Sequence, residues 1–125
     1  MNNERWIEIG YTKDAYSYIT ASDIFVLPNK ETYFDLVMIE ALSLGMPVVA
    51  SRTGGNKYYE EEKAKGVVLY NSISECCSII TNLINDRDGL ISMGKSNLDF
   101  YKMNLTTEKM CSYYINVINR ILEDC

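Results

Sequence analysis

Two glutamates and a pair of glycines are the residues of this sequence whose types and spacing best suit ligand binding. Glu31 precedes, and Glu40 lies within, a segment that is apolar at almost every other position, FDLVMIEALSL (34–44). Because a carboxylate among apolar neighbours needs a partner, we favour a ligand for Glu40 over a partly exposed helix position. Glu31 fits a ligand contact and an exposed loop charge equally well. Gly54 and Gly55 either let the backbone approach a ligand closely or form only a tight turn.

These residues follow two predicted strands, IFVLP (24–28) and PVVAS (47–51), which are short and continuously apolar. Pro28 fits only the end of a strand, because proline cannot donate to the hydrogen-bond ladder. Continuous apolar strands that alternate with helices indicate a parallel sheet covered on both faces. Ligands bind outside the carboxyl ends of the strands in such sheets. The loops at 28–34 and 52–56 therefore lie at the expected binding edge.

Two further strands are predicted, WIEIG (6–10) and GVVLY (66–70), which makes about four in all. Three helices are predicted with signals at their ends: 12–23 with Thr12 as N-cap, 34–44 followed by Gly45 at C′ and by Pro47, and 72–86 with a capping box of Ser72 and Glu75. A polar helix or turn is predicted at 57–65, one or two helices within 88–102, and a last helix from near Thr106. The apolar stripe of the last helix is Met110, Tyr113, Tyr114, Val117, Ile118, Ile121 and Leu122. We therefore expect a single α/β domain over 1–125, with βα units over 1–71 and a helical region over 72–125.

The composition limits the classes of function. Hydrophobic residues make up 47% of the 125-residue chain, which excludes disorder, and no apolar run approaches the length of a membrane span. The net charge of −5 argues against nucleic acid as a partner. The sequence has no histidine, and its four cysteines, Cys76, Cys77, Cys111 and Cys125, show no CxxC spacing. The cysteines at 76 and 77 suit small core residues or a free thiol, and the first residues show no signal-peptide pattern, so we expect the reducing cytoplasm.

The segment ASDIFVLPNKETYFDLVMIEALSLGMPVVASRTGG (21–55) resembles the donor-binding part of the GT-B glycosyltransferases, most closely the retaining enzymes of family 4, or glycosyl transferases group 1. The family pattern is a strand ending in D-hydrophobic-F-V-x-P, then E-x7-E, then P-V-V-A and G-G. The counterparts here are Asp23, Phe25 to Pro28, Phe34, Leu36, Glu40, Ala41, Gly45, Pro47 to Ala50, Gly54 and Gly55. The resemblance implies the C-terminal part of a Rossmann-like GT-B domain.

The resemblance also implies that a nucleotide-sugar binds at this edge, without a cofactor or a metal. Glu40 would accept hydrogen bonds from the ribose hydroxyls, and the first glutamate of the pattern would contact the sugar. Backbone amides at the start of the helix would hold the diphosphate. Counted back from Glu40, the E-x7-E pattern places its first glutamate at position 32, which is Thr32 here. Either Thr32 contacts the sugar, or a one-residue bulge in the loop brings Glu31 to that position. Asp35 replaces a family glycine and either caps the helix or adjoins the diphosphate. The expected donor-binding set is Glu31, Thr32, Phe34, Asp35, Leu36, Glu40, Gly54 and Gly55.

The implied function is transfer of a sugar from a nucleotide donor with retention of configuration, as in polysaccharide biosynthesis. This chain would supply donor binding and no catalytic residue. The alternatives are the binding half of a split transferase and a non-catalytic interaction domain. The family's N-terminal half lies outside this sequence, so that half, or a second copy of the chain, is an expected partner. The inner face of a membrane is an alternative location for the whole enzyme.

In the family fold, two strands that this sequence lacks separate the strand at 6–10 from the strand at 24–28. An open apolar sheet edge invites pairing with another chain. We therefore expect residues 6–10 either to pair directly with residues 24–28 or to take part in a dimer.

Overall fold

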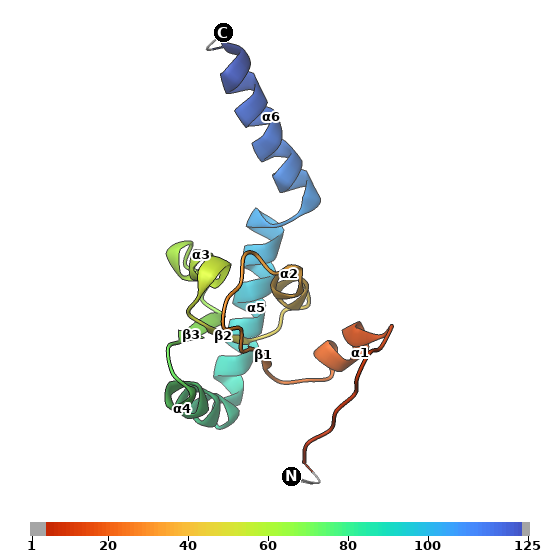
Figure 1. The fold of residues 1–125 in the computed structure, drawn as a ribbon, viewed down its shortest axis with the longest axis vertical. Helices are drawn as coiled ribbons and strands as arrows, with labels where there is room; N and C mark the ends of the chain where they lie inside the picture. The colour runs from red at the N-terminus through yellow and green to blue at the C-terminus, as the bar shows by residue number, and fades with distance from the viewer. Residues whose placement is uncertain (1–4, 124–125) are drawn as a thin grey trace.

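The computed structural model describes residues 5–123 and has an α/β fold around a three-stranded parallel sheet of order β1-β2-β3 (Figure 1). The elements in chain order are α1 (Ala15–Thr20), β1 (Phe25–Leu27), α2 (Leu36–Ser43), β2 (Val48–Ser51), the 3₁₀ helix η1 (Gly54–Asn56), α3 (Lys57–Glu61), β3 (Val67–Tyr70), α4 (Ile73–Ile84), α5 (Arg87–Asn104) and α6 (Thr107–Glu123). The predicted α/β class, the parallel strands and the helical C-terminal region are confirmed.

The central strand β2 lies at the heart of the core. It pairs in parallel with both neighbours, and Phe25 of β1 lies opposite Val48. Val48, Val49 and Ala50 are fully buried, so both faces of β2 are covered. On β1, by contrast, Val26 is 38% exposed. The prediction of a parallel sheet with helices on both faces is therefore confirmed, and β1 is its less covered outer strand.

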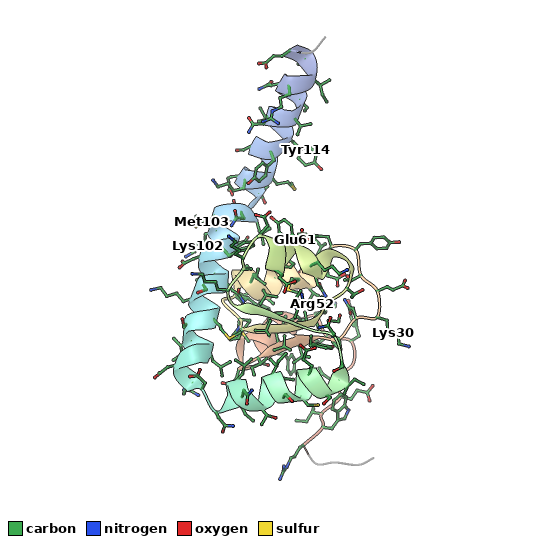
Figure 2. All side chains as sticks on the ribbon, turned by 90° about the vertical axis from the view of Figure 1, so that its left-hand side faces the viewer. Lys30, Arg52, Glu61, Lys102, Met103 and Tyr114 are labelled. Atoms are coloured by element: carbon green, nitrogen blue, oxygen red, sulfur yellow. The ribbon has the colours of Figure 1, made fainter. Side chains whose placement is uncertain are left out.

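Helices α2 and α3 lie on one face of the sheet and α4 on the other, and α5 runs beside the sheet (Figure 2). Helix α2 places Met38, Ala41 and Leu42 in the core. Tyr59 of α3 is also almost fully buried there. These contacts fix the position of α2 and hence of the loop that leads into it.

Helix α5 closes the amino ends of the strands. The Asn97 side chain is fully buried, and its Nδ2 donates to the carbonyl oxygens of Met46 and Gly66, each at 2.8 Å. These two carbonyls lie just before β2 and β3. Gly94 of α5 also touches Gly45, because a Cβ on Gly94 would stand 2.2 Å from the Gly45 carbonyl oxygen. The carboxyl ends of the strands, at the opposite edge, are left clear of α5.

The predicted signals at two helix ends are confirmed. Gly45 has φ +67° immediately after the C-cap of α2, as expected of a C′ glycine. The Ser72 hydroxyl accepts from the Glu75 N–H at 3.1 Å, and Glu75 Oε2 accepts from the Asn71 N–H at 2.7 Å. A reciprocal cap is therefore present, although the carboxylate reaches one residue beyond the N-cap.

Residues 6–10 form no strand, which corrects the expected number from about four strands to three. Trp6 and Ile7 are 76% and 79% exposed. A strand needs a neighbour for its backbone hydrogen bonds, and β1 is paired only with β2. The expected pairing of residues 6–10 with residues 24–28 is therefore wrong, and their participation in a dimer stays a prediction.

Helix α1 is shorter than predicted and begins at Ala15, with Asp14 rather than Thr12 as its N-cap. The Asp14 carboxylate accepts from the Ser17 N–H at 3.3 Å and from the Ser17 hydroxyl at 2.8 Å. The Thr12 hydroxyl accepts instead from the Asp14 N–H at 3.0 Å. Thr12 therefore organises the turn before the helix.

The other boundaries differ from the predictions by smaller amounts. The loop expected at 52–56 is partly helical, because it contains η1, which runs directly into α3. The segment predicted as one or two helices is the single helix α5. Helix α6 begins at Thr107, close to the predicted start at Thr106. Within the described residues, no helix combines the length and the apolar character that crossing a membrane requires.

The cysteines make no disulfide among the described residues. Cys76, Cys77 and Cys111 are free thiols, and the first of these is half-buried while the others are exposed. Cys125 lies outside the described residues.

Candidate functional site

The candidate site lies at the carboxyl edge of the sheet, where the loop 28–35 after β1 faces the segment 52–55 after β2. Figure 2 shows Lys30 and Arg52 on this side, across the sheet from Lys102 of α5. The loops therefore bring most of the predicted site residues to one edge, namely Glu31, Thr32, Phe34, Asp35, Leu36, Gly54 and Gly55. Glu40 follows on α2.

Two side-chain hydrogen bonds hold the loop 28–35. Asn29 Nδ2 donates to Asp35 Oδ2 at 2.5 Å, which joins the two ends of the loop. The Thr53 hydroxyl donates to the Lys30 carbonyl oxygen at 3.3 Å. The loop is thus tied both to itself and to the segment that follows β2.

Gly54 and Gly55 bring the two segments into direct backbone contact. A Cβ on Gly54 would stand 1.7 Å from the Thr32 carbonyl oxygen, and a Cβ on Gly55 would stand 1.6 Å from the Tyr33 carbonyl oxygen. Gly54 also has φ +45°, a conformation that favours glycine. These glycines therefore let the segment after β2 pack closely against the loop 28–35. Their contact with a ligand stays a prediction.

Phe34 anchors the same loop on α3. Its ring stacks on that of Tyr59 at a centroid distance of 5.7 Å and meets Tyr58 edge-on at 5.4 Å. Burial raises the pKa of Tyr59, with smaller contributions from Tyr58 and Asp35, and its hydroxyl has no hydrogen-bond partner among the described residues. Tyr59 is therefore neutral and serves as a packing surface. Phe34 is still 44% exposed, so part of its ring remains at the surface.

The two glutamates are exposed on the outer side of the site. Glu40 lies one turn after Leu36 on α2, and Leu36 is 73% exposed. Leu36 therefore shares the exposed face of Glu40, whereas the apolar neighbours Met38 and Ala41 are fully buried on another face of the helix. Neither glutamate side chain has a hydrogen bond or an ion pair within residues 5–123. Both carboxylates are therefore free to accept hydrogen bonds from a ligand.

The side chains of Thr32 and Asp35 are less exposed than those of the two glutamates. The Thr32 hydroxyl is buried and lacks a hydrogen-bond partner in the described part of the chain. Asp35 stands at the N-cap position of α2, but its carboxylate bonds Asn29 and makes no capping bond. The predicted capping position is confirmed and the predicted capping bond is wrong. The N–H groups of the first turn of α2 consequently have no side-chain cap.

A shallow hollow of about 500 Å³ opens beside the loop 28–35, at the carboxyl ends of all three strands. Its lining includes Lys30 and Arg52 but neither of the two glutamates. The Arg52 guanidinium is ion-paired with Glu60, so its charge is partly compensated. Among residues 5–123, no group of three or more cysteine, aspartate and glutamate side chains could hold a metal ion.

Asn29 and Thr53 shape the site but were not identified from the sequence. Asn29 follows the strand-ending Pro28, and asparagine at such a position commonly bonds within a turn, which is the signal that could have singled it out. The partner of Thr53 is 23 residues away in the chain, so no local pattern reveals it.

Comparison with known proteins gives one family. Residues 2–86 match the family model described as glycosyl transferases group 1. Sulfoquinovosyl transferase SQD2 of Arabidopsis thaliana is 34% identical over 80 residues, which are 61% of this chain and 16% of the relative. A D-inositol 3-phosphate glycosyltransferase of Corynebacterium kroppenstedtii is 31% identical over 88 residues, which are 70% of this chain and 20% of the relative.

A third relative matches almost the whole chain. The Vi polysaccharide biosynthesis protein VipC/TviE of Salmonella typhi is 24% identical over 122 residues, which are 92% of this chain and 21% of the relative. The chain thus spans between 16% and 21% of the length of these three proteins. Because the family model covers more than half of the sequence, this protein belongs to the glycosyl transferases group 1 family.

Proposed function

We propose that this chain binds the nucleotide-sugar donor of a retaining glycosyltransferase at the carboxyl edge of its sheet. The observation that carries the proposal is the loop 28–35, which two side-chain hydrogen bonds hold next to α2 while the carboxylates of Glu31 and Glu40 remain free. A preorganised loop with unpaired acceptors suits a ligand that carries several hydroxyl groups. Membership of the glycosyl transferases group 1 family supports the same substrate class.

Glu40 is assigned to the ribose. An ionised carboxylate has two oxygens and accepts charge-assisted hydrogen bonds from two neighbouring hydroxyls, which is the geometry of a ribose diol. Its position one turn into α2 leaves the helix N-terminus for the diphosphate, where uncapped N–H groups and the positive end of the helix dipole favour an anion. The two contacts together orient the nucleotide along α2.

Glu31 is assigned to the sugar in preference to Thr32. The Thr32 hydroxyl is buried behind the loop and faces no solvent, whereas the Glu31 side chain is exposed beside it. The extra residue between Glu31 and Glu40 is accommodated in the loop, which the close packing of Gly54 and Gly55 holds in place.

Asp35 is assigned a positioning role, because a carboxylate next to a diphosphate would repel it. The hydrogen bond from Asn29 holds the Asp35 side chain at the base of the loop. Phe34 and Leu36 flank this position with partly exposed apolar surface that a sugar or a base could cover.

The reaction of the whole protein would move the sugar from the nucleotide to an acceptor with retention of configuration, and no metal or cofactor enters this proposal. The Salmonella typhi relative is named as a polysaccharide biosynthesis protein, which supports polysaccharide biosynthesis as the context of this reaction. An interaction domain is the second candidate function, and the exposed apolar stripe of α6 is the observation that favours it.

The test is a titration of UDP and of GDP into the 125-residue chain and its Glu40→Gln variant, followed by calorimetry and by NMR. Because the glutamates stand on an open surface, we expect a dissociation constant nearer the millimolar than the micromolar range, roughly −4 to −6 kcal/mol. Glu40→Gln keeps the size of the side chain but loses its charge, and should weaken binding by about 1.5–3 kcal/mol.

A matched control is Glu123→Gln, which makes the same change on an exposed residue at the far end of α6. We expect this control to bind both nucleotides like the wild type. Equal affinity in the wild type and Glu40→Gln would remove Glu40 from the site. Absence of binding by either nucleotide at about 10 mM would contradict donor binding by this chain.

A further inference from the structure

Tyr33 lies in the loop 28–35, between residues that are assigned to the donor, and its side chain is 96% exposed. Within the part of the chain that the structure describes, its ring meets no other aromatic ring and its hydroxyl makes no hydrogen bond. A single exposed apolar side chain is common in proteins, so exposure alone carries no function. The backbone and the neighbours of Tyr33 are what distinguish it.

The backbone at Tyr33 is held in place although its side chain is free. Its carbonyl oxygen packs against Gly55, where a Cβ would stand 1.6 Å away. The Thr53 hydroxyl donates to the carbonyl oxygen of Lys30 earlier in the loop, and a second hydrogen bond joins the two ends of the loop. A ring on a backbone that is already ordered loses less freedom when it meets a ligand than a ring on a mobile loop would lose.

The side chains along this loop alternate between exposed and covered positions. Glu31 and Tyr33 are exposed, whereas the hydroxyl of Thr32 between them is buried. The Phe34 ring that follows is held on Tyr59 of α3. An exposed carboxylate and an exposed aromatic ring are therefore close neighbours on the solvent side of the loop.

These two kinds of group complement different parts of a sugar ring. Carboxylate oxygens accept hydrogen bonds from the hydroxyl groups at the edge of a pyranose. The C–H groups on the face of a pyranose are weakly positive, and the face of an aromatic ring is negative, so the two faces attract each other. Glu31 and Tyr33 together can therefore hold a sugar by its edge and by its face.

The position of Tyr33 favours the sugar over the nucleobase. Helix α2 begins at Leu36, and its N-terminus is assigned to the diphosphate. Glu40, assigned to the ribose, lies beyond that point along the helix, whereas Glu31 and Tyr33 precede it. A nucleotide-sugar that extends from Glu40 past the start of α2 to Glu31 brings its sugar, and not its base, to Tyr33.

We propose that the Tyr33 ring stacks on the sugar of the donor and thereby favours a hexopyranose whose C–H groups gather on one face. This inference rests on the proposed function, because it extends the donor site that Glu31 and Glu40 define. Tyr33 would contribute to the binding of the nucleotide-sugar and not to that of the nucleotide alone. That difference separates its role from the role of Glu40, which acts on both.

The experiment titrates the 125-residue chain with two matched pairs of ligands, UDP with UDP-glucose and GDP with GDP-mannose, followed by NMR. The measured quantity is the dissociation constant of the nucleotide divided by that of its nucleotide-sugar, because this ratio isolates the contribution of the sugar. For the pair that binds more tightly, Tyr33→Ala should lower the ratio about three- to tenfold and change the affinity for the nucleotide by no more than about twofold. Tyr33→Phe keeps the aromatic face and should keep the ratio within about twofold of the wild type.

The matched control is Tyr114→Ala, which removes an exposed ring from α6, well clear of the sheet (Figure 2). This variant should leave the ratio unchanged. Thermal melts of each variant check the fold, and we expect little change because the Tyr33 side chain is exposed.

Three results would overturn the inference. A Tyr33→Ala variant with the same ratio as the wild type would remove the ring from the sugar site while leaving the role of Glu40 intact. A variant that binds the nucleotide and the nucleotide-sugar equally more weakly would place the ring elsewhere on the ligand. Binding of none of the four ligands by the wild type would overturn the proposed function, and this inference with it.

Discussion

Gly54 and Gly55 set the position of the loop that carries the proposed sugar-facing and phosphate-facing groups. The carbonyl oxygens of Thr32 and Tyr33 occupy the space where their Cβ atoms would lie. The two glycines therefore act through the backbone of the loop 28–35, whatever they contact in a bound ligand. The site thus depends on a backbone-to-backbone contact that no other residue type permits.

Replacement of Gly55 by alanine should separate the two segments. A Cβ at this position would stand 1.6 Å from the Tyr33 carbonyl oxygen, a distance that only a shift of the backbone can relieve. We expect a loss of about 1–3 kcal/mol in the free energy of unfolding, measured by urea denaturation. The control is Ser74→Ala on α4, an exposed position where the change adds no atom and the free energy of unfolding should change by no more than about 0.5 kcal/mol. A Gly55→Ala variant as stable as the wild type would show that the contact is not required.

Asn97 has the corresponding role at the opposite edge of the sheet. Its Nδ2 bonds the carbonyls of Met46 and Gly66, so Asn97→Ala would leave two buried acceptors without donors and open a small cavity. We expect the free energy of unfolding to fall by about 2–4 kcal/mol. Asn85→Ala is the control, because its single bond to the Thr81 carbonyl is exposed and worth no more than about 1 kcal/mol. Similar losses in the two variants would contradict the importance of the buried bonds.

At the scale of single elements, α4 offers a test that depends on pH. The Glu75 carboxylate accepts from the Asn71 N–H, and this bond lowers its pKa from the ordinary value of 4.5. A lowered pKa in the folded state stabilises the fold at every pH above the unfolded value, and the effect is lost as the pH falls through the folded value. We therefore expect the wild type to be more stable than Glu75→Gln at pH 7 and the difference to shrink progressively below pH 4.5.

The measurement is urea denaturation of both proteins at pH 7, 4.5 and 3. Glu61→Gln is the control, since Glu61 is exposed on α3 and has no hydrogen-bond partner among the described residues. A difference between wild type and Glu75→Gln that is constant with pH would rule out the ionised carboxylate as its source.

The elements that the sequence predicts well are those whose signals are local. Buried strands appear as continuous apolar runs, and the ends of α2 and α4 follow from Gly45 and Ser72. Residues 6–10 were predicted as a strand from the same kind of pattern, but a strand exists only with a neighbour, and no short stretch specifies that neighbour. Helix α1 was placed too early because Thr12 and Asp14 compete for the N-cap, and geometry alone decides between them.

The candidate site was predicted in its location and only partly in its construction. The position of the loop 28–35 follows from strand order, which sequence patterns reveal. The bond from Asn29 to Asp35, and the filling of the space at Gly54 by a carbonyl oxygen, depend on how the loop folds back on itself. An exposed position for Glu40 was considered only as the alternative to a ligand, because an almost wholly apolar helix does not reveal which side meets the sheet.

At the scale of the whole molecule, the closed and open surfaces are clearly divided. Helix α5 closes the amino edge of the sheet, and α2, α3 and α4 cover its faces (Figure 1). The surfaces left open are the carboxyl edge with its two free glutamates, the outer strand β1 and the stripe of α6. The carboxyl edge can therefore contact a ligand on one side, but no other part of the described residues faces that edge to enclose the ligand.

This arrangement leads to the last prediction, that the 125-residue chain has no transferase activity of its own. Sugar transfer requires donor and acceptor to be held together in near-attack geometry, and the open carboxyl edge of this sheet offers a surface for the donor only. The matched relatives, of which this chain spans 16% to 21%, offer far more sequence with which to bind an acceptor. Incubation with UDP- and GDP-sugars should release nucleoside diphosphate no faster than buffer does, while a whole enzyme of the same family, assayed in parallel, turns over. Steady, enzyme-dependent release by the purified chain would mean that its surface completes a reaction site unaided, and would overturn the assignment of this chain to donor binding alone.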